Sequence, residues 1–325
     1  MSERYARQTI LPEVGAAGQA RLAAASVLVV GAGGLGSPVL ATLAGAGVGR
    51  LTILDHDRVE ESNLHRQPLY RMADLGRAKA EAARGALLAA NPEITVEALP
   101  RRLAVAETPA LVARHDLALD CADSLAVTYS LSDACRDAGK PLVSASVLGL
   151  SGYVGAFCGG GPSYRAVFPD MPSTVGSCAV NGVLGSAVAV LGALQAHMAL
   201  QLLLGIAPTP LGRLVSLDLR TLTFGGFAFG DAEEPAEAPV RFIGLSAVDP
   251  ADLVIELRGP EEAPEPAVPH ALRLAPAAIA ADPAIIPSDR RVVFCCASGV
   301  RAYRAARLLA ASGARDVAVL ALSLA

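Results

Sequence analysis

The stretch VLVVGAGGLGSPVL, residues 27–40, decides the fold of this chain of 325 residues. A run of apolar β-formers leads into a Gly-x-Gly-Gly-x-Gly turn, and an apolar segment of helical character follows. Gly31 permits the tight turn, and Gly33 and Gly34 let backbone amides approach a phosphate group. Gly36 then lets the following helix pack closely on the strand. Such a turn suits either a dinucleotide that carries hydride or the phosphates of ATP, and the glycines alone do not decide between them.

Strand and helix patterns alternate after this turn. Residues 50–55 (RLTILD), 94–99 (ITVEAL) and 115–123 (HDLALDCAD) predict strands, and residues 79–91 predict a helix. Residues 136–147 (RDAGKPLVSASV) predict the end of a helix and a further strand. This alternation predicts an α/β fold with a doubly wound, mostly parallel, Rossmann-like sheet, whose ligands bind at the carboxyl ends of the strands.

Length, charge and cysteine usage narrow the class of protein. A chain of 325 residues exceeds one typical compact core, so we expect two domains. The net charge of -4 gives no overall attraction to nucleic acid or to anionic lipid. The N-terminal segment has no apolar run long enough for a signal peptide, so we expect a cytoplasmic protein. The six cysteines form no Cys-x-x-Cys pair, which indicates free thiols.

Residues 183–207 (VLGSAVAVLGALQAHMALQLLLGIA) are long and apolar enough to span a membrane. Gln195, His197 and Gln201 interrupt the second half of this segment. A buried helix of a globular enzyme has the same composition, so we interpret the segment as a core helix and expect no membrane contact.

Charged residues after the second strand distinguish between the two nucleotides. Asp55 ends that strand, about 20 residues after the glycine turn, where an acidic side chain accepts hydrogen bonds from a ribose in either kind of site. Arg66 and Lys79 add positive charge, and Asp123 offers a ligand for a hard divalent cation. A triphosphate needs such cations to offset the charge that moves onto leaving pyrophosphate. Because backbone amides satisfy the diphosphate of a nicotinamide cofactor, this set favours ATP with Mg²⁺.

Several motifs connect the chain to a known family. They occur in order across most of residues 4–225 and are RYARQTILPEVG, GAGGLGS, AGVGRLTILDHDRVEESNLHRQ, GRAKAEAAR, NP, HDLALDCAD and KPLVSA. In these motifs the chain resembles the MoeB/ThiF group of ubiquitin-activating-enzyme-like adenylyltransferases. By this resemblance Gly34 lies against the phosphates, and Asp55 holds the ribose. The residues implied to contact the triphosphate are Asn63, Arg66 and Lys79. Asp123 is implied to hold Mg²⁺.

The resemblance also implies an activity and partners. Enzymes of this group adenylate the C-terminal glycine carboxylate of a ubiquitin-like sulfur-carrier protein ending in Gly-Gly, and they release pyrophosphate. Such carriers serve molybdopterin, thiamine or related sulfur pathways. Arg7 matches an arginine that reaches the active site of the partner subunit, which implies a homodimer with composite sites. Cys178 matches a cysteine that forms a thioester or disulfide with the carrier, and a buried cysteine that merely packs fits the same position.

The chain departs from the family pattern in two places. Ser163 and Ala166 stand where the family commonly has Cys-x-x-Cys, and the second cysteine pair is missing before Cys295. Because thiolates make the structural zinc site of the family, we predict that this chain binds no zinc. Ser124 and Thr128 replace the usual asparagine and arginine. Because of these replacements, the activity or the choice of carrier can differ from that of the relatives.

Residues 230–240 are acidic and carry prolines, which predicts a linker between an adenylation domain at 1–229 and a smaller α/β domain at 241–325. The smaller domain resembles a rhodanese, a module fused to this family in some sulfur-transfer enzymes, because CASGVR matches its catalytic loop. The resemblance implies that Cys296 carries a persulfide among the backbone amides of a helix N-terminus, and that Arg301 closes the loop.

The rhodanese-like module is degenerate. Glu256 replaces the usual aspartate, and VPHA stands where Ile-Pro-Gly-Ala is expected. A vestigial domain that only packs, with Cys296 as a core residue, is therefore an equal alternative.

Three alternatives to a sulfur-carrier adenylyltransferase stay open at this point. One is an enzyme that adenylates a different carboxylate, such as a peptide or a modified tRNA, although that reaction has no use for a sulfur-transfer domain. Another is a catalytically inactive dimeric module that binds a carrier, which the changes at Ser124 and Thr128 allow. A dehydrogenase is the least favoured, because it has little need for the positive charges of Arg66 and Lys79 or for a divalent cation at Asp123.

Overall fold

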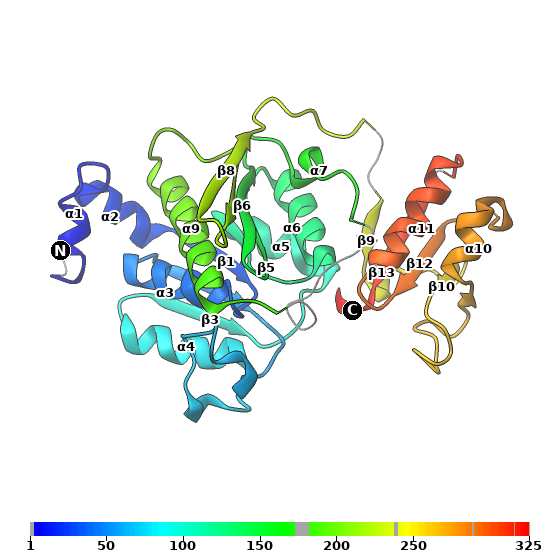
Figure 1. Ribbon diagram of the computed structural model, residues 1–325, viewed down its shortest axis with the longest axis horizontal. Coiled ribbons are helices and arrows are strands. Elements are labelled where there is room, and N and C mark those ends of the chain that lie inside the picture. The colour runs from blue at the N-terminus through cyan, green and yellow to red at the C-terminus, as the bar shows by residue number, and fades with distance from the viewer. Residues whose placement is uncertain (1–2, 173–181, 237–239, 288, 315, 325) are drawn as a thin grey trace.

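The computed structural model describes residues 3–172, 182–236, 240–287, 289–314 and 316–324. In this part of the chain the strands form a larger and a smaller sheet (Figure 1). The strands of the larger sheet are β1 (Ser26–Val30), β2 (Arg50–Leu54), β3 (Thr95–Leu99), β4 (Leu117–Asp120), β5 (Pro141–Leu148), β6 (Ser151–Cys158), β7 (Arg213–Asp218) and β8 (Thr223–Ala228). Those of the smaller sheet are β9 (Arg241–Ile243), β10 (Leu253–Glu256), β11 (Leu272–Arg273), β12 (Val292–Cys296) and β13 (Val317–Ala321).

The helices connect and cover these strands. They are α1 (Ala6–Thr9), α2 (Gly15–Ala24), α3 (Gly36–Ala46), α4 (Lys79–Ala90), α5 (Thr108–Ala113), α6 (Leu125–Ala138), α7 (Tyr164–Val167), α9 (Gly185–Leu204), α10 (Pro276–Ala281) and α11 (Val300–Ala311). Two short 3-10 helices, η2 (Glu61–Asn63) and η7 (Leu322–Leu324), are used below.

The larger sheet has the strand order β3-β2-β1-β4-β5-β6-β7-β8. The strands from β3 to β5 are parallel, and β6, β7 and β8 continue the sheet in antiparallel pairing. The sheet grows in opposite directions from β1, so β1 and β4 flank the point where open α/β sheets bind ligands. The predicted α/β fold with a doubly wound, mostly parallel sheet is confirmed. The antiparallel edge was not predicted.

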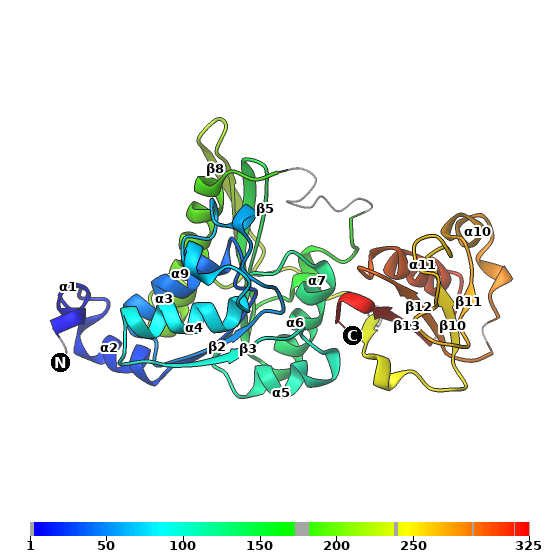
Figure 2. The same ribbon diagram turned by 90° about the horizontal axis from the view of Figure 1, so that it is seen from below.

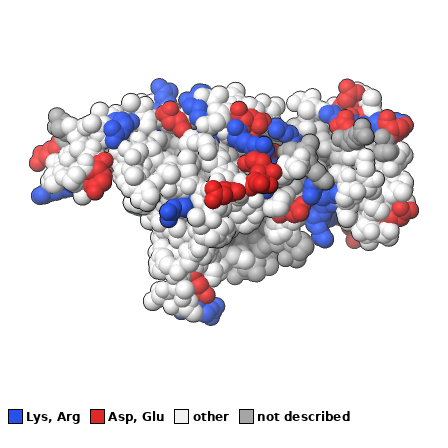
Figure 3. Space-filling view, turned by 90° about the horizontal axis from the view of Figure 1, so that it is seen from above, with Lys and Arg blue, Asp and Glu red and all other residues white. Residues whose placement is uncertain are grey.

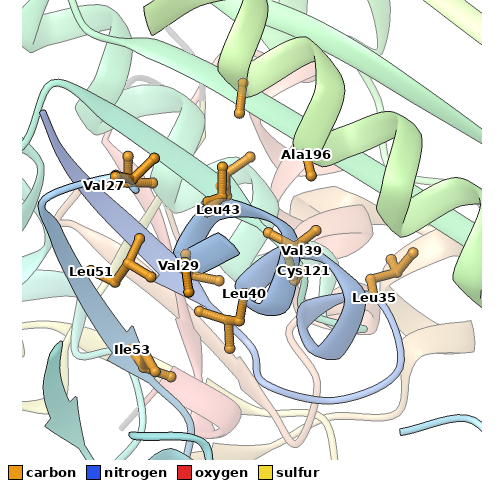
Figure 4. Packing of buried hydrophobic residues seen from close by; sticks show 14 of the residues in the cluster. Val27, Val29, Leu35, Val39, Leu40, Leu43, Leu51, Ile53, Cys121 and Ala196 are labelled. Carbon is orange, nitrogen blue, oxygen red and sulfur yellow. The ribbon is translucent and has the colours of Figure 1, made fainter. Parts of the chain in front are cut away.

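Helices cover both faces of the larger sheet because its central strands are apolar on both sides. In β1, Val27 and Val29 pack with α3 and α9, whereas Leu28 and Val30 pack with α5 and α6. Alternate residues of a strand point to opposite faces, so a sheet covered on both faces requires a continuous apolar run. Figure 4 shows side chains of α3 lying over β1 and β2, with Ala196 of α9 beyond them.

The predicted core helix is α9, which packs against α3 and against β5 and β6. Among the described residues it is the one helix long and apolar enough to cross a membrane, and half of its most apolar stretch is buried. Gln195 of this helix is fully buried and donates to the main-chain oxygens of Asp120 (2.7 Å) and Val143 (3.1 Å). Gln195, one of the polar residues that interrupt the apolar pattern, thus ties the helix to β4 and β5.

The smaller unit lies against α6 and α7 (Figure 2). Arg165 of α7 is buried and joins the two units: it pairs with Asp133 of α6 at 2.7 and 3.0 Å and donates to the Tyr303 hydroxyl of α11 at 3.1 Å. A buried charge is stable only when its hydrogen bonds are made, so these partners fix the junction. One apolar cluster, which includes Tyr129 of α6 and Phe242 of β9, continues across it.

The predicted linker contacts the larger unit. The Glu234 carboxylate accepts hydrogen bonds from the main-chain N–H and the hydroxyl of Ser163, both at 2.7 Å, and lies 3.3 Å from Arg136. Ser163 is one of the positions where the resemblance described above led us to expect a cysteine. A hydrogen-bond network centred on a carboxylate therefore occupies that place.

Both signs of charge are interspersed on the surface. On the face in Figure 3, Lys and Arg lie beside Asp and Glu in small groups, with wide uncharged areas between the groups. This distribution agrees with the small net charge of -4. The described residues of this face form no broad basic field of the kind that attracts nucleic acid.

Candidate functional site

A cavity of about 420 Å³ lies at the carboxyl ends of β1, β2 and β4 and beside β5. We call it the central cavity. The residues predicted to bind nucleotide or metal that line it are Gly31, Gly33, Gly34, Asp55, Asn63, Arg66, Lys79 and Asp123. Neighbouring parallel strands end at the same edge of a sheet, and this is why segments distant in the sequence meet here.

The glycine turn forms one wall of the central cavity. Gly31 has a φ of 97°, in the left-handed region that favours glycine, and a Cβ there would lie 2.6 Å from the carbonyl oxygen of Cys121. Gly36, the first residue of α3, does not line the cavity, but a Cβ there would overlap the Gly31 carbonyl group. At Gly33 the nearest atom to such a Cβ is Nε2 of Gln67, at 3.6 Å. The shape of the turn therefore requires glycine at 31 and 36, whereas Gly33 leaves room for a ligand.

Two aspartates that follow β2 organise the next wall. The carboxylate oxygens of Asp55 are buried and accept the main-chain N–H groups of Ala32 and Asp57, both at 2.7 Å. Burial raises the pKa of Asp55 although these hydrogen bonds oppose the shift. The ammonium of Lys79, at the start of α4, lies 2.9 Å from the Asp57 carboxylate. Burial alone would raise the pKa of Asp57, but the hydrogen bond and charge of Lys79 lower it. Sequence reasoning missed Asp57, whose signal is the second acidic residue of LDHD.

Polar side chains after η2 complete this side of the central cavity. Asn63 Oδ1 accepts the side-chain N–H of Gln67 at 2.9 Å, and Gln67 Oε1 is buried without a hydrogen-bond partner among the described residues. Arg66 is half-buried and donates to the Ser62 carbonyl at 3.0 Å. An unpaired buried acceptor costs about 1–3 kcal/mol, so Gln67 marks a place where a bound ligand would supply a donor.

Hydroxyl groups line the opposite side of the cavity. The fully buried carboxylate of Asp120, at the end of β4, accepts the hydroxyl protons of Thr128 (2.7 Å) and Ser144 (2.8 Å). Beside them, the hydroxyls of Tyr153 and Tyr164 lie 2.6 Å apart. Because Thr128 and Ser144 direct their protons to Asp120, their oxygen lone pairs remain available to N–H donors in the cavity. We call Thr128 and Ser144 the hydroxyl wall.

A pH experiment tests the state of Asp120. Burial raises its pKa from 3.8 to about 6, against the hydrogen bonds from Thr128 and Ser144. The native state then binds this proton more tightly than the unfolded chain, so the group lowers stability progressively as the pH rises from about 4 to about 6. We expect the Asp120→Asn variant, which cannot ionise, to gain about 2–3 kcal/mol of unfolding free energy relative to wild type between pH 4 and pH 7. Urea unfolding measures the difference, and an equal difference at both pH values would assign Asp120 an ordinary pKa.

Some predicted residues lie elsewhere. Arg7 is exposed on α1 and does not line the central cavity, and Cys178 lies outside the described residues. Cys296 is fully buried at the end of β12, and its sulfur accepts a main-chain N–H from the first turn of α11 at 3.4 Å. The Arg301 guanidinium pairs with Glu262 at 2.8 Å. The hydrogen bond from Arg301 to Glu262 raises the pKa of Arg301, and the nearby Cys296 contributes to the shift.

Oxygen donors for a divalent cation are present at the cavity. Ligand atoms of Asp55, His56 and Asp57 lie within 4.8 Å of one another, but both carboxylates already bind main-chain N–H groups or Lys79. Asp123 carries an exposed carboxylate at the cavity. Carboxylate oxygen suits Mg²⁺, and the donor best placed to hold it is therefore Asp123.

Comparisons with known proteins show the family of the chain. The chain matches the ThiF family over residues 5–237. It is 49% identical over 218 residues to the adenylyltransferase and sulfurtransferase MOCS3 of Bos taurus, with 66% of this chain and 48% of that protein covered. It is 45% identical over 230 residues to the sulfur carrier protein adenylyltransferase of Thermus thermophilus, with 68% of this chain and 85% of that protein covered. The chain thus spans about half the length of the MOCS3 relatives.

Solved structures share the fold. The structure of E. coli MccB with ATP aligns with a TM-score of 0.62 at 22% identity, and the alignment covers 73% of this chain and 74% of MccB. PaaA aligns with a TM-score of 0.60 at 24% identity, with 70% of this chain and 73% of PaaA covered. At these identities the likeness concerns the arrangement of the sheet and its helices.

Proposed function

The chain belongs to the ThiF family, as its motifs indicated, and from this membership we propose that it is an ATP-dependent adenylyltransferase. Its substrate is the C-terminal glycine carboxylate of a ubiquitin-like sulfur-carrier protein ending in Gly-Gly, and its products are an acyl adenylate and pyrophosphate. The observation that carries the proposal is that eight residues expected to bind ATP and Mg²⁺ line one cavity. A cytoplasmic role in molybdopterin or thiamine biosynthesis fits this chemistry.

Each group of cavity residues has a separate role in the proposed reaction. The glycine turn presents backbone N–H groups to the phosphates at the start of α3, and Asp55 accepts hydrogen bonds from the ribose. The residues that offset the charge of the triphosphate are Asn63, Arg66 and Lys79. Asp123 would hold Mg²⁺, which neutralises phosphate charge when bound. The carrier carboxylate attacks the α-phosphorus, the bond to the bridging oxygen breaks, and pyrophosphate leaves. Because the carboxylate is already ionised, the reaction needs no general base. Positioning of the reactants and neutralisation of charge supply most of the catalysis.

The hydroxyl wall suits the acyl side of the reaction. A Gly-Gly tail presents main-chain N–H groups and no side chains. Thr128 and Ser144 offer acceptors for such donors, because Asp120 holds their protons. Thr128 replaces an arginine of the family, so this chain would bind the tail through neutral hydrogen bonds.

Three further assignments accompany the proposal. We place Arg7 in the cavity of a second copy of the chain, which makes the enzyme a homodimer with composite sites. Ser163 and Ala166 offer no thiolate, and the bond from Ser163 to Glu234 supports a zinc-free protein. Residues 241–325 form the rhodanese-like domain, in which the N–H donated to Cys296 supports a persulfide at that sulfur.

Exchange of labelled pyrophosphate into ATP tests the proposed activity. With Mg²⁺ and a carrier ending in Gly-Gly we expect exchange that depends on the carrier and disappears when its last glycine is removed. The truncated carrier keeps every other contact and is the matched control. ATP binding without exchange for several carriers would contradict the proposal and favour a carrier-binding module. Exchange that a peptide supports without a carrier would instead indicate a different carboxylate substrate.

A further inference from the structure

One wall of the central cavity comes from the smaller unit. Ser323, in η7 after β13, lines the cavity together with Arg102 and Leu103 of the segment after β3. Figure 2 shows this last turn, in red beside the C label, between the smaller unit and α6, and η7 contacts α6. A ligand in the central cavity would therefore touch both units.

The main-chain atoms of Ser323 connect the loop after Cys296 to the segment after β3. The Ser323 N–H donates to the carbonyl of Ala297 at 2.9 Å, and the Ser323 carbonyl accepts from Arg102 at 3.3 Å. Ala297 follows Cys296 directly, and a Cβ at Gly299 of the same loop would lie 3.5 Å from the Cβ of Ala126 in α6. The loop proposed to carry sulfur is thus one hydrogen bond away from the cavity wall.

The side-chain hydroxyl of Ser323 is unsatisfied. Its Oγ is buried and has no hydrogen-bond partner among the described residues. Buried polar atoms of native proteins are almost always paired, so a ligand or water is expected to complete this one. The cavity residues beside it include Arg102 and two apolar residues: Leu103 adjoins Arg102, and Leu125 begins the helix on which η7 packs. The two apolar side chains suit the base of a nucleoside.

We propose that the smaller unit supplies Ser323 to the nucleotide site, where its hydroxyl pairs with the nucleoside part of ATP. This assignment rests on the proposed adenylyltransferase function. ATP then binds the docked arrangement of the two units better than an arrangement in which they have separated. By reciprocity, ATP holds the loop after Cys296 in place, and docking strengthens ATP binding by the same factor.

The Ser323→Ala variant tests the contact. It keeps both main-chain hydrogen bonds and loses only the hydroxyl, so we expect ATP and AMP to bind about 3- to 10-fold more weakly, with tripolyphosphate unaffected. Calorimetry measures the three affinities. Ser298→Ala is the matched control, because Ser298 is exposed on the same loop and does not line the cavity. Unchanged ATP affinity in Ser323→Ala, or equal weakening of tripolyphosphate, would overturn the assignment.

Alkylation of Cys296 by a maleimide tests the coupling. The sulfur is fully buried and does not line the cavity, so ATP cannot shield it directly. We expect ATP to slow alkylation about 5-fold or more in wild type, read by peptide mass spectrometry, and to slow it less in Ser323→Ala.

The Tyr303→Phe variant loses hydroxyl contacts to Arg165 and Pro169 that lie away from the cavity. Without ATP, we expect Cys296 of this variant to react faster than in wild type, and we expect the variant to bind ATP more weakly.

The outcomes separate this inference from the proposed function. ATP that binds without changing the rate at Cys296 would overturn the coupling and leave the adenylation proposal intact. A protein that binds no ATP at all would contradict the proposed function itself.

Discussion

The Asp123→Ala variant is expected to lose ATP–pyrophosphate exchange by about 1,000-fold, equivalent to roughly 4 kcal/mol of transition-state stabilisation. Asp123 carries an exposed carboxylate at the central cavity, so its removal takes away the proposed Mg²⁺ ligand and spares the core. Asp289→Ala removes an exposed carboxylate of the smaller unit that does not line the cavity, and it should retain wild-type exchange. Exchange by Asp123→Ala within a few-fold of wild type would place the metal ligand elsewhere.

Mixing two inactive variants extends this experiment to the proposed homodimer. Arg7→Ala removes the residue that we place in the partner's cavity, and Asp123→Ala disables the cavity of its own chain. A mixed dimer then contains one intact composite site. An equal mixture in which subunits exchange freely should recover about a quarter of wild-type exchange, because half of the dimers are mixed and half of their sites are intact. No recovery after subunit exchange would show that Arg7 acts in its own chain, and wild-type exchange by Arg7→Ala alone would show that Arg7 has no catalytic part.

The parallel part of the fold could be predicted because its signals are local. The run VLVV before the glycine turn and the acidic residues that end β2 and β4 belong to single short segments. The place of Asp55 and Asp123 at the cavity could therefore be predicted from the sequence, since a residue that follows a parallel strand lies at the ligand edge of the sheet. The antiparallel strands β6 to β8 gave no comparable signal, because glycines interrupt β8 and the apolar run of β6.

The partners of the site residues could not be predicted, because they come from distant segments. Asp120 belongs to the same motif as Asp123, yet its role depends on Ser144, which β5 brings to it. Gln67 can be recognised only in the folded structure, where its side-chain oxygen is buried without a hydrogen-bond partner among the described residues. Ser323 lies more than 200 residues from the segment after β3 that it contacts, and only the docking of the two units makes it part of the cavity. Tertiary contacts of this kind leave no periodic pattern in a single sequence.

The largest loss of stability is expected for Gly36→Ala. A Cβ at this position would lie 2.9 Å from the carbonyl carbon of Gly31 and still closer to its oxygen. Both of these close atoms belong to the backbone, which cannot turn aside as a flexible side chain can, so β1 and α3 must separate. We expect a loss of at least about 3 kcal/mol in unfolding free energy, together with loss of ATP binding. Urea unfolding at neutral pH and calorimetry with ATP measure the two effects.

The Gly33→Ala variant distinguishes the role of the turn in stability from its role in ATP binding. A Cβ at Gly33 meets only the Gln67 side chain, at ordinary contact distance, so stability should change by less than about 1 kcal/mol. The added methyl group nevertheless stands on the wall that the phosphates approach, and ATP should bind more weakly to this folded variant. If Gly36→Ala were as stable as Gly33→Ala, the turn would have relaxed around the methyl group. The close packing of α3 on β1 would then not be what the last glycine of the motif provides.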